Sequence, residues 1–197
     1  MPKTLRTMMA LALALSAALA PSAAIAQGGF VLDGRLPPDV PDDVVVEARI
    51  GTDLQGIVPD AVATASVDDG RFRLELPGSV DDDLLEPEPI DCDRERTIDA
   101  VFLPYLTLVQ DDEAVGRLVH TDVPRELWSY AGPPRSASWV YTPDSATAVE
   151  ACANERLELA FEPGWNPFVV LAGSDAVDVT TDAPPASFRW IFVADAP

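Results

Sequence analysis

Two cysteines, Cys92 and Cys152, have the most constrained chemistry in this 197-residue chain. A redox-active pair would favour the Cys-x-x-Cys spacing, whereas these two lie far apart in the sequence. In an exported protein a single pair of cysteines predicts one structural disulfide, because the compartment is oxidising. Closing so long a loop should stabilise the fold by about 4 kcal/mol, since the unfolded chain loses entropy.

Few other side chains suit catalysis. His120 is the one histidine, so a Ser-His-Asp triad would have to use it, and no Gly-x-Ser-x-Gly motif is present. Lys3 is the one lysine and falls in the leader described below, which excludes Schiff-base and P-loop lysine chemistry from the remainder. One histidine and two cysteines cannot form a zinc site of the usual spacing without several carboxylates. We expect His120 to be packed or solvated, and the protein not to be an enzyme.

Carboxylates are plentiful, and they keep two other chemistries open. A glycosidase needs two carboxyl groups that face each other across a sugar, and the sequence neither shows nor excludes that arrangement. Asp81, Asp82 and Asp83 offer the hard oxygens that Ca²⁺ prefers, as do residues 111–113, but neither run matches a calcium-binding loop. We expect solvated acidic turns that bind Ca²⁺ loosely at most, and no firmly bound cofactor.

Aromatic side chains form the most suggestive binding feature. Trp128 with Tyr130, and Trp139 with Tyr141, occupy alternate positions of two short predicted strands. If those strands pair as a hairpin, the four rings share one face, which would stack sugars or peptide if exposed and would fill a core if buried. We expect burial for Trp139, and we leave Trp128 open because its strand is predicted to lie near an edge.

The first 26 residues have the pattern of a secretory signal peptide. Lys3 and Arg6 precede an apolar run over residues 8–20, and Ala24 and Ala26 form a small-x-small cleavage site. The apolar run is too short for a transmembrane anchor. We therefore expect a secreted or periplasmic protein that begins near Gln27 and is not inserted in the membrane after cleavage.

The chain is strongly acidic, with 33 Asp and Glu against 13 Lys and Arg and a formal net charge of −20. Cleavage would remove two of the cations and none of the acids, which makes the charge about −22. Nucleic acids and anionic lipids are bound through clustered positive charge, so both are disfavoured as partners. A protein or an envelope polysaccharide remains open.

Period-two alternation predicts an all-β fold with little helix after the signal peptide. In the second predicted strand, residues 44–50 alternate between apolar and polar side chains, and 19 prolines suit turns and edges. We expect an antiparallel β-sandwich, as one large or two small sandwich-like domains. Strands are predicted near residues 30–36, 44–50, 61–67, 71–76, 101–109, 114–120, 127–130, 138–141, 156–161, 166–172 and 187–193.

A stretch rich in acid and proline, residues 80–96, is a candidate connector between residues 27–79 and residues 97–197. Asp69-Gly70 before it should form a tight hairpin turn, because both residues tolerate positive φ. The second part is either a separate β-rich domain or the remainder of one sandwich.

Gly34 in an opening strand, Gly51 after the second strand, and the Asp69-Gly70-Arg71-Phe72 hairpin together resemble the transthyretin-like, or carboxypeptidase-regulatory-like, β-sandwich module. The resemblance covers about a quarter of the chain. It lacks the small Gly-Ala pair usual before the second strand and the Gly-x-Tyr usual after the last hairpin. The resemblance implies a small structural or adhesive module without catalytic residues.

The sequence thus predicts an exported, non-catalytic structural or interaction protein of the bacterial envelope or exterior. The alternative is a small extracellular hydrolase that uses carboxylates, or a calcium-dependent carbohydrate-binding protein. Two convergent carboxyl groups in a cleft would distinguish the alternative.

Overall fold

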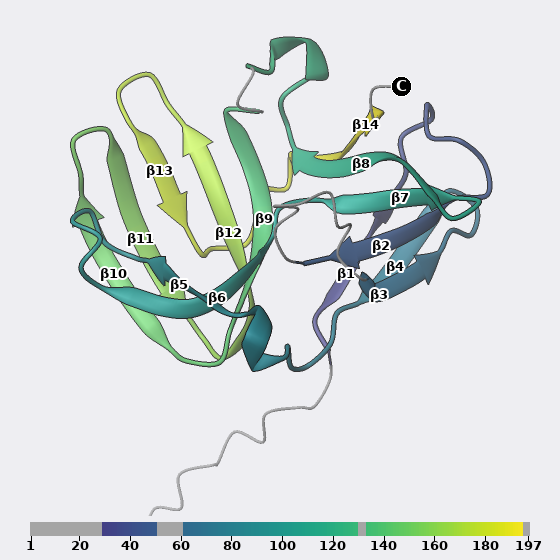
Figure 1. The fold of residues 1–197 in the computed structure, drawn as a ribbon. Helices are drawn as coiled ribbons and strands as arrows, with labels where there is room; N and C mark the ends of the chain where they lie inside the picture. The colour runs from purple at the N-terminus through teal and green to yellow at the C-terminus, as the bar shows by residue number, and fades with distance from the viewer. Residues whose placement is uncertain (1–28, 51–60, 130–132, 195–197) are drawn as a thin grey trace, which may run out of the picture.

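The computed structural model describes residues 29–50, 61–129 and 133–194, and their regular structure is almost entirely β-strand (Figure 1). The described residues contain two three-residue 3-10 helices, η1 (Asp82–Leu84) and η2 (Arg125–Leu127), and neither is long or apolar enough to cross a membrane. The strands are β1 (Val31–Arg35), β2 (Val45–Arg49), β3 (Ala61–Ser66), β4 (Arg71–Glu75), β5 (Glu86–Pro89), β6 (Thr97–Leu103), β7 (Leu106–Gln110), β8 (Glu113–Thr121), β9 (Arg135–Thr142), β10 (Ala146–Ala151), β11 (Glu155–Phe161), β12 (Gly164–Ala172), β13 (Val177–Thr180) and β14 (Arg189–Ala194). The predicted all-β sandwich is confirmed.

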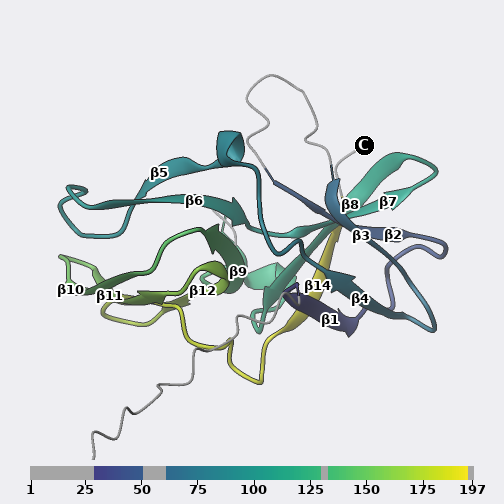
Figure 2. The ribbon, with the colours of Figure 1, turned by 90° about the horizontal axis from the view of Figure 1, so that it is seen from below.

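The strands form one large sheet and one small sheet. The large sheet runs β10-β11-β13-β12-β9-β8-β7-β2-β3, with β14 on β8 and the β5–β6 pair on β9, while β1 and β4 pair as the small sheet. Figure 2 shows the layers edge on: β5 and β6 lie over β10 to β12, and β2, β3 and β7 lie over β1 and β4. Pairing is antiparallel except between β11 and β13, which run parallel.

Two larger apolar cores fill the space between these layers, and Ala137, Val169 and Phe188 form a third, smaller cluster. The first core lies at the β1–β4 side and the second lies between β5–β6 and the β10–β13 strands (Figure 2). The first core includes Leu32, Val46, Phe72, Leu74, Leu76, Leu103, Leu106, Leu108, Leu118, Trp139, Tyr141, Trp165 and Trp190. The second includes Ile90, Ile98, Ala100, Val140, Ala148, Leu159, Phe161 and Val179.

Strands β6 and β9 serve both cores, and we call them the shared wall. Ile98 and Ala100 of β6 pack in the second core, whereas Val101 of the same strand packs in the first. In β9, Val140 packs in the second core and Trp139 in the first. Because successive side chains of a strand point to opposite faces, a strand buried on both faces needs a continuous apolar run, and these two strands have one.

The Asp69-Gly70 turn forms as predicted, with φ of 51° at Asp69 and 69° at Gly70. Asp68 and Arg71 exchange two backbone hydrogen bonds of 2.9 Å across it. The pairing of β3 with β4 does not continue beyond this turn. Along its length β4 pairs with β1 instead of β3. Within β4 the predicted alternation is observed: the apolar side chains are buried and the arginines are exposed.

Several strand predictions need correction. The strand predicted over residues 101–109 is two strands, β6 and β7, separated by Pro104 and Tyr105. Residues 125–127 form η2, so the predicted strand at 127–130 is not a strand at Leu127 and Trp128. β5, β10 and β13 were not predicted. β5 lies in the candidate connector 80–96 and pairs with β6.

Candidate functional site

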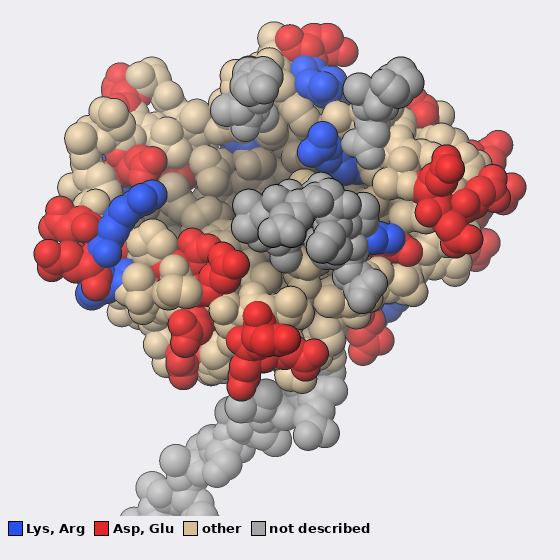
Figure 3. Space-filling view, in the orientation of Figure 1, with Lys and Arg blue, Asp and Glu red and all other residues tan. Residues whose placement is uncertain are grey.

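The cavity that we call the arginine–aromatic pocket has a volume of about 700 Å³ and lies where β8, η2, β9 and β14 meet. On the face in Figure 3, acidic side chains crowd both flanks and the lower edge, while basic side chains gather at the upper centre beside a hollow. The pocket is lined by Pro104, Tyr105, Arg117, Val119, Arg125, Trp128, Ser129, Pro133, Ser136 and Val193.

One side of the pocket is built by the alternation of β8. Leu118 and His120 point toward the core, so Arg117 and Val119 point to the opposite face, which is the pocket side. The guanidinium carbon of Arg117 lies 5.2 Å from the centre of the Tyr105 ring, which comes from the turn between β6 and β7. This cation–π contact fixes the long arginine side chain in one place.

The other side of the pocket is built by η2 and the residues after it. The guanidinium carbon of Arg125 lies 5.0 Å from the centre of the Trp128 ring. The Trp128 ring is held in turn by a hydrogen bond of 2.9 Å, which its indole Nε1–H donates to the backbone oxygen of Val123. Trp128 is half-buried, and Arg125 is exposed.

The pocket differs in its charge from two other cavities. The described residues of its lining include two arginines and no Asp or Glu. A cavity over β10, β11 and β13 is lined by four acids and one arginine, and a third cavity beside Arg96 is lined by Asp99 and Asp144. A guanidinium presents its N–H groups in a fork that matches the two oxygens of a carboxylate. The pocket can therefore receive an anion on a protein that elsewhere repels anions.

Comparisons of the chain with protein-family models, with curated proteins and with solved structures gave no match. The resemblance of residues 27–79 to a transthyretin-like module stays a prediction.

The structure separates the four aromatic residues that the sequence grouped. Trp139 and Tyr141 lie in β9 with 3% and 7% of their surface exposed, in the first core, so Trp139 is buried as expected. Trp128 follows η2 and lines the pocket, and Tyr130 lies outside the described residues. The condition under which the four rings would share one face of a hairpin is not met at Trp128, because Trp128 follows η2 and lies in no strand.

His120 is packed, as one of the two expected outcomes, and it lies among aromatic rings. Its ring centre is 4.8 Å from Trp190, and 5.8 Å from both Trp139 and Phe188. Its Nδ1 atom is buried and makes no hydrogen bond among the described residues. Burial lowers the pKa of His120 to about 4, because the charged form loses its water. A neutral, enclosed ring of this kind suits packing.

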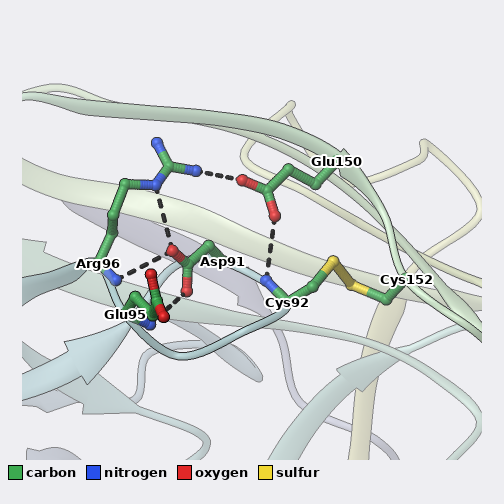
Figure 4. The surroundings of a disulfide bond; sticks show 6 residues. All are labelled: Asp91, Cys92, Glu95, Arg96, Glu150 and Cys152. Carbon is green, nitrogen blue, oxygen red and sulfur yellow. Dashed lines mark hydrogen bonds and ion pairs between the residues drawn. A yellow bond between two sulfur atoms is a disulfide. The ribbon is translucent and has the colours of Figure 1, made fainter.

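The predicted disulfide between Cys92 and Cys152 is present, with Cα atoms 5.5 Å apart (Figure 4). It joins the loop before β6 to the end of β10. Beside it, Arg96 forms ion pairs with both Asp91 and Glu150, and the Cys92 N–H donates to a Glu150 oxygen at 3.1 Å. Desolvation would raise the pKa of Asp91, but hydrogen bonds from Arg96 and from the Glu95 N–H outweigh it, so the pKa of Asp91 is lowered.

The acidic run Asp81, Asp82 and Asp83 lies at η1 and is exposed at all three positions. Among the described residues, no group of three or more His, Cys, Asp or Glu is arranged to hold a metal ion. The weak calcium prediction for this run therefore gains no support from the geometry.

Of the residues that line the pocket, sequence reasoning singled out only Trp128, and it missed the other members of the two cation–π contacts, which are Tyr105, Arg117 and Arg125. Arg117 looked like any exposed position of an alternating strand, and nothing local indicates that Tyr105 lies beneath it. One signal in the sequence could have indicated the pocket. Arg125 lies three residues before Trp128, and a single helical turn brings residues at that spacing together.

Proposed function

We propose that this protein is an exported, non-catalytic binding module that recognises its partner through the arginine–aromatic pocket. The observation that carries the proposal is the composition of the pocket, whose described residues bring two arginines and two aromatic rings to one cavity and include no acid. Binding sites favour aromatic residues and arginine, and a cavity of this volume suits a small ligand or one group of a larger one.

Export is part of the proposal and has separate support. The ordered leader over residues 1–26 is typical of secretion, and the disulfide is typical of an oxidising compartment. The described part of the chain has no helix that could span a membrane. A periplasmic or extracellular protein would meet envelope polysaccharides and exported proteins as partners.

A non-catalytic role agrees with the chemistry of the pocket. Hydrolysis of a glycosidic bond needs a carboxylic acid and a carboxylate that face each other, and no described residue of the pocket lining carries a carboxyl group. Its arginines are suited to bind and orient an anion, because arginine stays protonated and cannot act as a general base.

The experiment is binding of the mature protein to glycan and peptide arrays, repeated with Trp128→Ala and Arg125→Gln. Both side chains line the pocket, and neither lies in a core, so the variants should fold. We expect both variants to lose the ligands of the wild type. Val149→Ala is the control, because Val149 is 81% exposed on β10 and does not line this pocket. If Trp128→Ala and Arg125→Gln bind the ligands as well as the control does, the proposal is overturned.

A further inference from the structure

The pocket carries a more specific inference about the ligand, and it rests on the function proposed above. We infer that the arginine–aromatic pocket binds a singly charged carboxylate carried on a sugar ring, as in a hexuronic acid. The lining of the pocket bears on three properties of the ligand: the sign of its charge, the number of its charges and the ring that carries the charge.

The pocket favours a negatively charged ligand. Four described arginines elsewhere form ion pairs with acids: Arg49 with Glu47, Arg96 with Asp91, Arg135 with Asp122 and Arg156 with Asp178. In the pocket, by contrast, Arg125 lies over the Trp128 ring and makes no ion pair within the described residues. Stacking on a ring leaves the edge of the guanidinium able to donate hydrogen bonds. Because a guanidinium donates and never accepts, its complement is an anion.

The charge of the whole protein favours a ligand with a single negative charge. The chain carries a net charge of −20, so every negative charge on a ligand is repelled by the whole molecule. A carboxylate carries one charge, and a phosphate monoester carries nearly two at neutral pH. A long polyanion would multiply the repulsion over many residues. A single carboxylate gains the contact with the arginines at the lowest cost.

The uncharged part of the pocket lining favours a sugar ring as the group that carries the charge. Trp128 and Tyr105 place rings in the lining beside apolar Val119 and Val193, and Ser136 adds a hydroxyl group. Rings of this kind pack against the apolar face of a ring, and a hydroxyl group can exchange hydrogen bonds with the hydroxyls of a sugar. A hydroxylated ring that bears a carboxylate meets the arginines, the aromatic rings and the serine together.

The test is isothermal titration of the folded mature protein with methyl galacturonoside, a single hexuronic acid ring that carries one carboxylate. Its methyl ester is the matched probe, because it has the same ring and lacks the charge. We expect the ester to bind at least tenfold more weakly, and the affinity for the acid to fall as NaCl is raised from 50 to 300 mM, since salt screens the arginines. An equal affinity for acid and ester would overturn the inference.

Variants locate the binding. Arg125→Gln should weaken the binding of methyl galacturonoside at least tenfold, and Arg117→Gln should do the same. Arg73→Gln is the matched control, because Arg73 is an exposed arginine on β4 that lines none of the cavities described here. Equal melting temperatures of the variants establish that all fold. Binding that survives in both pocket variants would place the sugar elsewhere and overturn the inference.

Two further outcomes separate this inference from the proposed function. If arrays return only neutral ligands that depend on Trp128, the pocket is a binding site and the carboxylate inference is wrong. If glucose 6-phosphate binds more tightly than methyl galacturonoside, the pocket prefers a doubly charged anion and the inference is also wrong. The proposed function fails only if the array ligands ignore both Trp128 and Arg125.

Discussion

At the scale of single residues, His120 links the packing of the first core to pH. In the unfolded chain its pKa should be near the ordinary value of about 6.5, whereas burial lowers the pKa to about 4 in the folded protein. Between these values the unfolded state binds more protons, so the free energy of unfolding decreases as the pH falls.

We expect His120 to account for about 2 to 3 kcal/mol of the stability lost between pH 7 and pH 4.5. Urea unfolding of the wild type and of His120→Leu at both pH values measures this. The variant should lose less stability than the wild type over the same range. Carboxylates titrate in both proteins, so the comparison isolates the histidine. Parallel pH profiles would contradict the assignment.

Two tryptophans should respond differently to truncation. Trp139 is buried in β9, stacked 5.4 Å from Trp190, so Trp139→Ala should lower the free energy of unfolding by about 3 to 5 kcal/mol. Trp128 is half-buried outside the cores, so Trp128→Ala should cost about 1 kcal/mol, mainly for its hydrogen bond. Thermal and urea unfolding of the two variants measure this, and losses of equal size would be inconsistent with the observed burial.

Gly34 lies beneath Trp190, and this contact explains a glycine within β1. A Cβ atom at Gly34 would lie 2.3 Å from Trp190 Cδ1 and 2.4 Å from its Nε1. We expect Gly34→Ala to destabilise the protein by about 1 to 3 kcal/mol, because the indole ring must shift in a packed core. Gly78→Ala is the control, since nothing lies within 4 Å of a Cβ at Gly78. A fully stable Gly34→Ala would show that Trp190 moves freely.

At the scale of elements, the disulfide fastens the loop before β6 to the end of β10, across a sequence separation of 60 residues. We expect Cys92→Ser with Cys152→Ser to lower the free energy of unfolding by up to about 4 kcal/mol, because the unfolded chain regains entropy. Urea unfolding measures the loss.

Glu150→Gln serves as the control for the disulfide variant. It keeps the disulfide and weakens the ion pair between Arg96 and Glu150, which is partly exposed and should cost less than 1 kcal/mol. Equal losses in the two proteins would mean that the charged network, and not the covalent link, holds these elements together.

Elements with regular alternation could be predicted from sequence, and those without it could not. β2 and β4 alternate cleanly and were predicted within a residue or two. β10 has the sequence ATAVEA, whose small and polar residues carry little periodic signal, and β5 contains two prolines that argue against a strand. The arginine–aromatic pocket could not be predicted as a whole, because its residues come from five separate segments that only the sheet pairing brings together.

At the scale of the whole molecule, the excess of acid should make stability depend on salt. Repulsion among the negative charges raises the free energy of the folded state, and added ions screen it. We expect NaCl to raise the melting temperature, and CaCl₂ at matched ionic strength to raise it by a similar amount, because no metal-binding group is present among the described residues.

Melting curves in EDTA, in CaCl₂ and in NaCl of the same ionic strength measure the effect. Asp82→Asn with Asp83→Asn serves as the control for the acidic run at η1, and its calcium response should match that of the wild type. A large rise that only calcium produces, and that this variant loses, would mean a specific calcium site at η1.

The shared wall also governs how this protein can diverge during evolution. On most strands of a sandwich one face is in contact with solvent, so half of the positions can change with little effect on stability. Residues 100–103 of β6 and 139–142 of β9 offer few such positions, because their side chains are buried or half-buried and most of them pack in one core or the other. Descendants of a common ancestor should therefore retain the apolar character and the length of these two segments while the acidic turns drift, which leaves AVFL and WVYT as the longest-lived traces of ancestry in the chain.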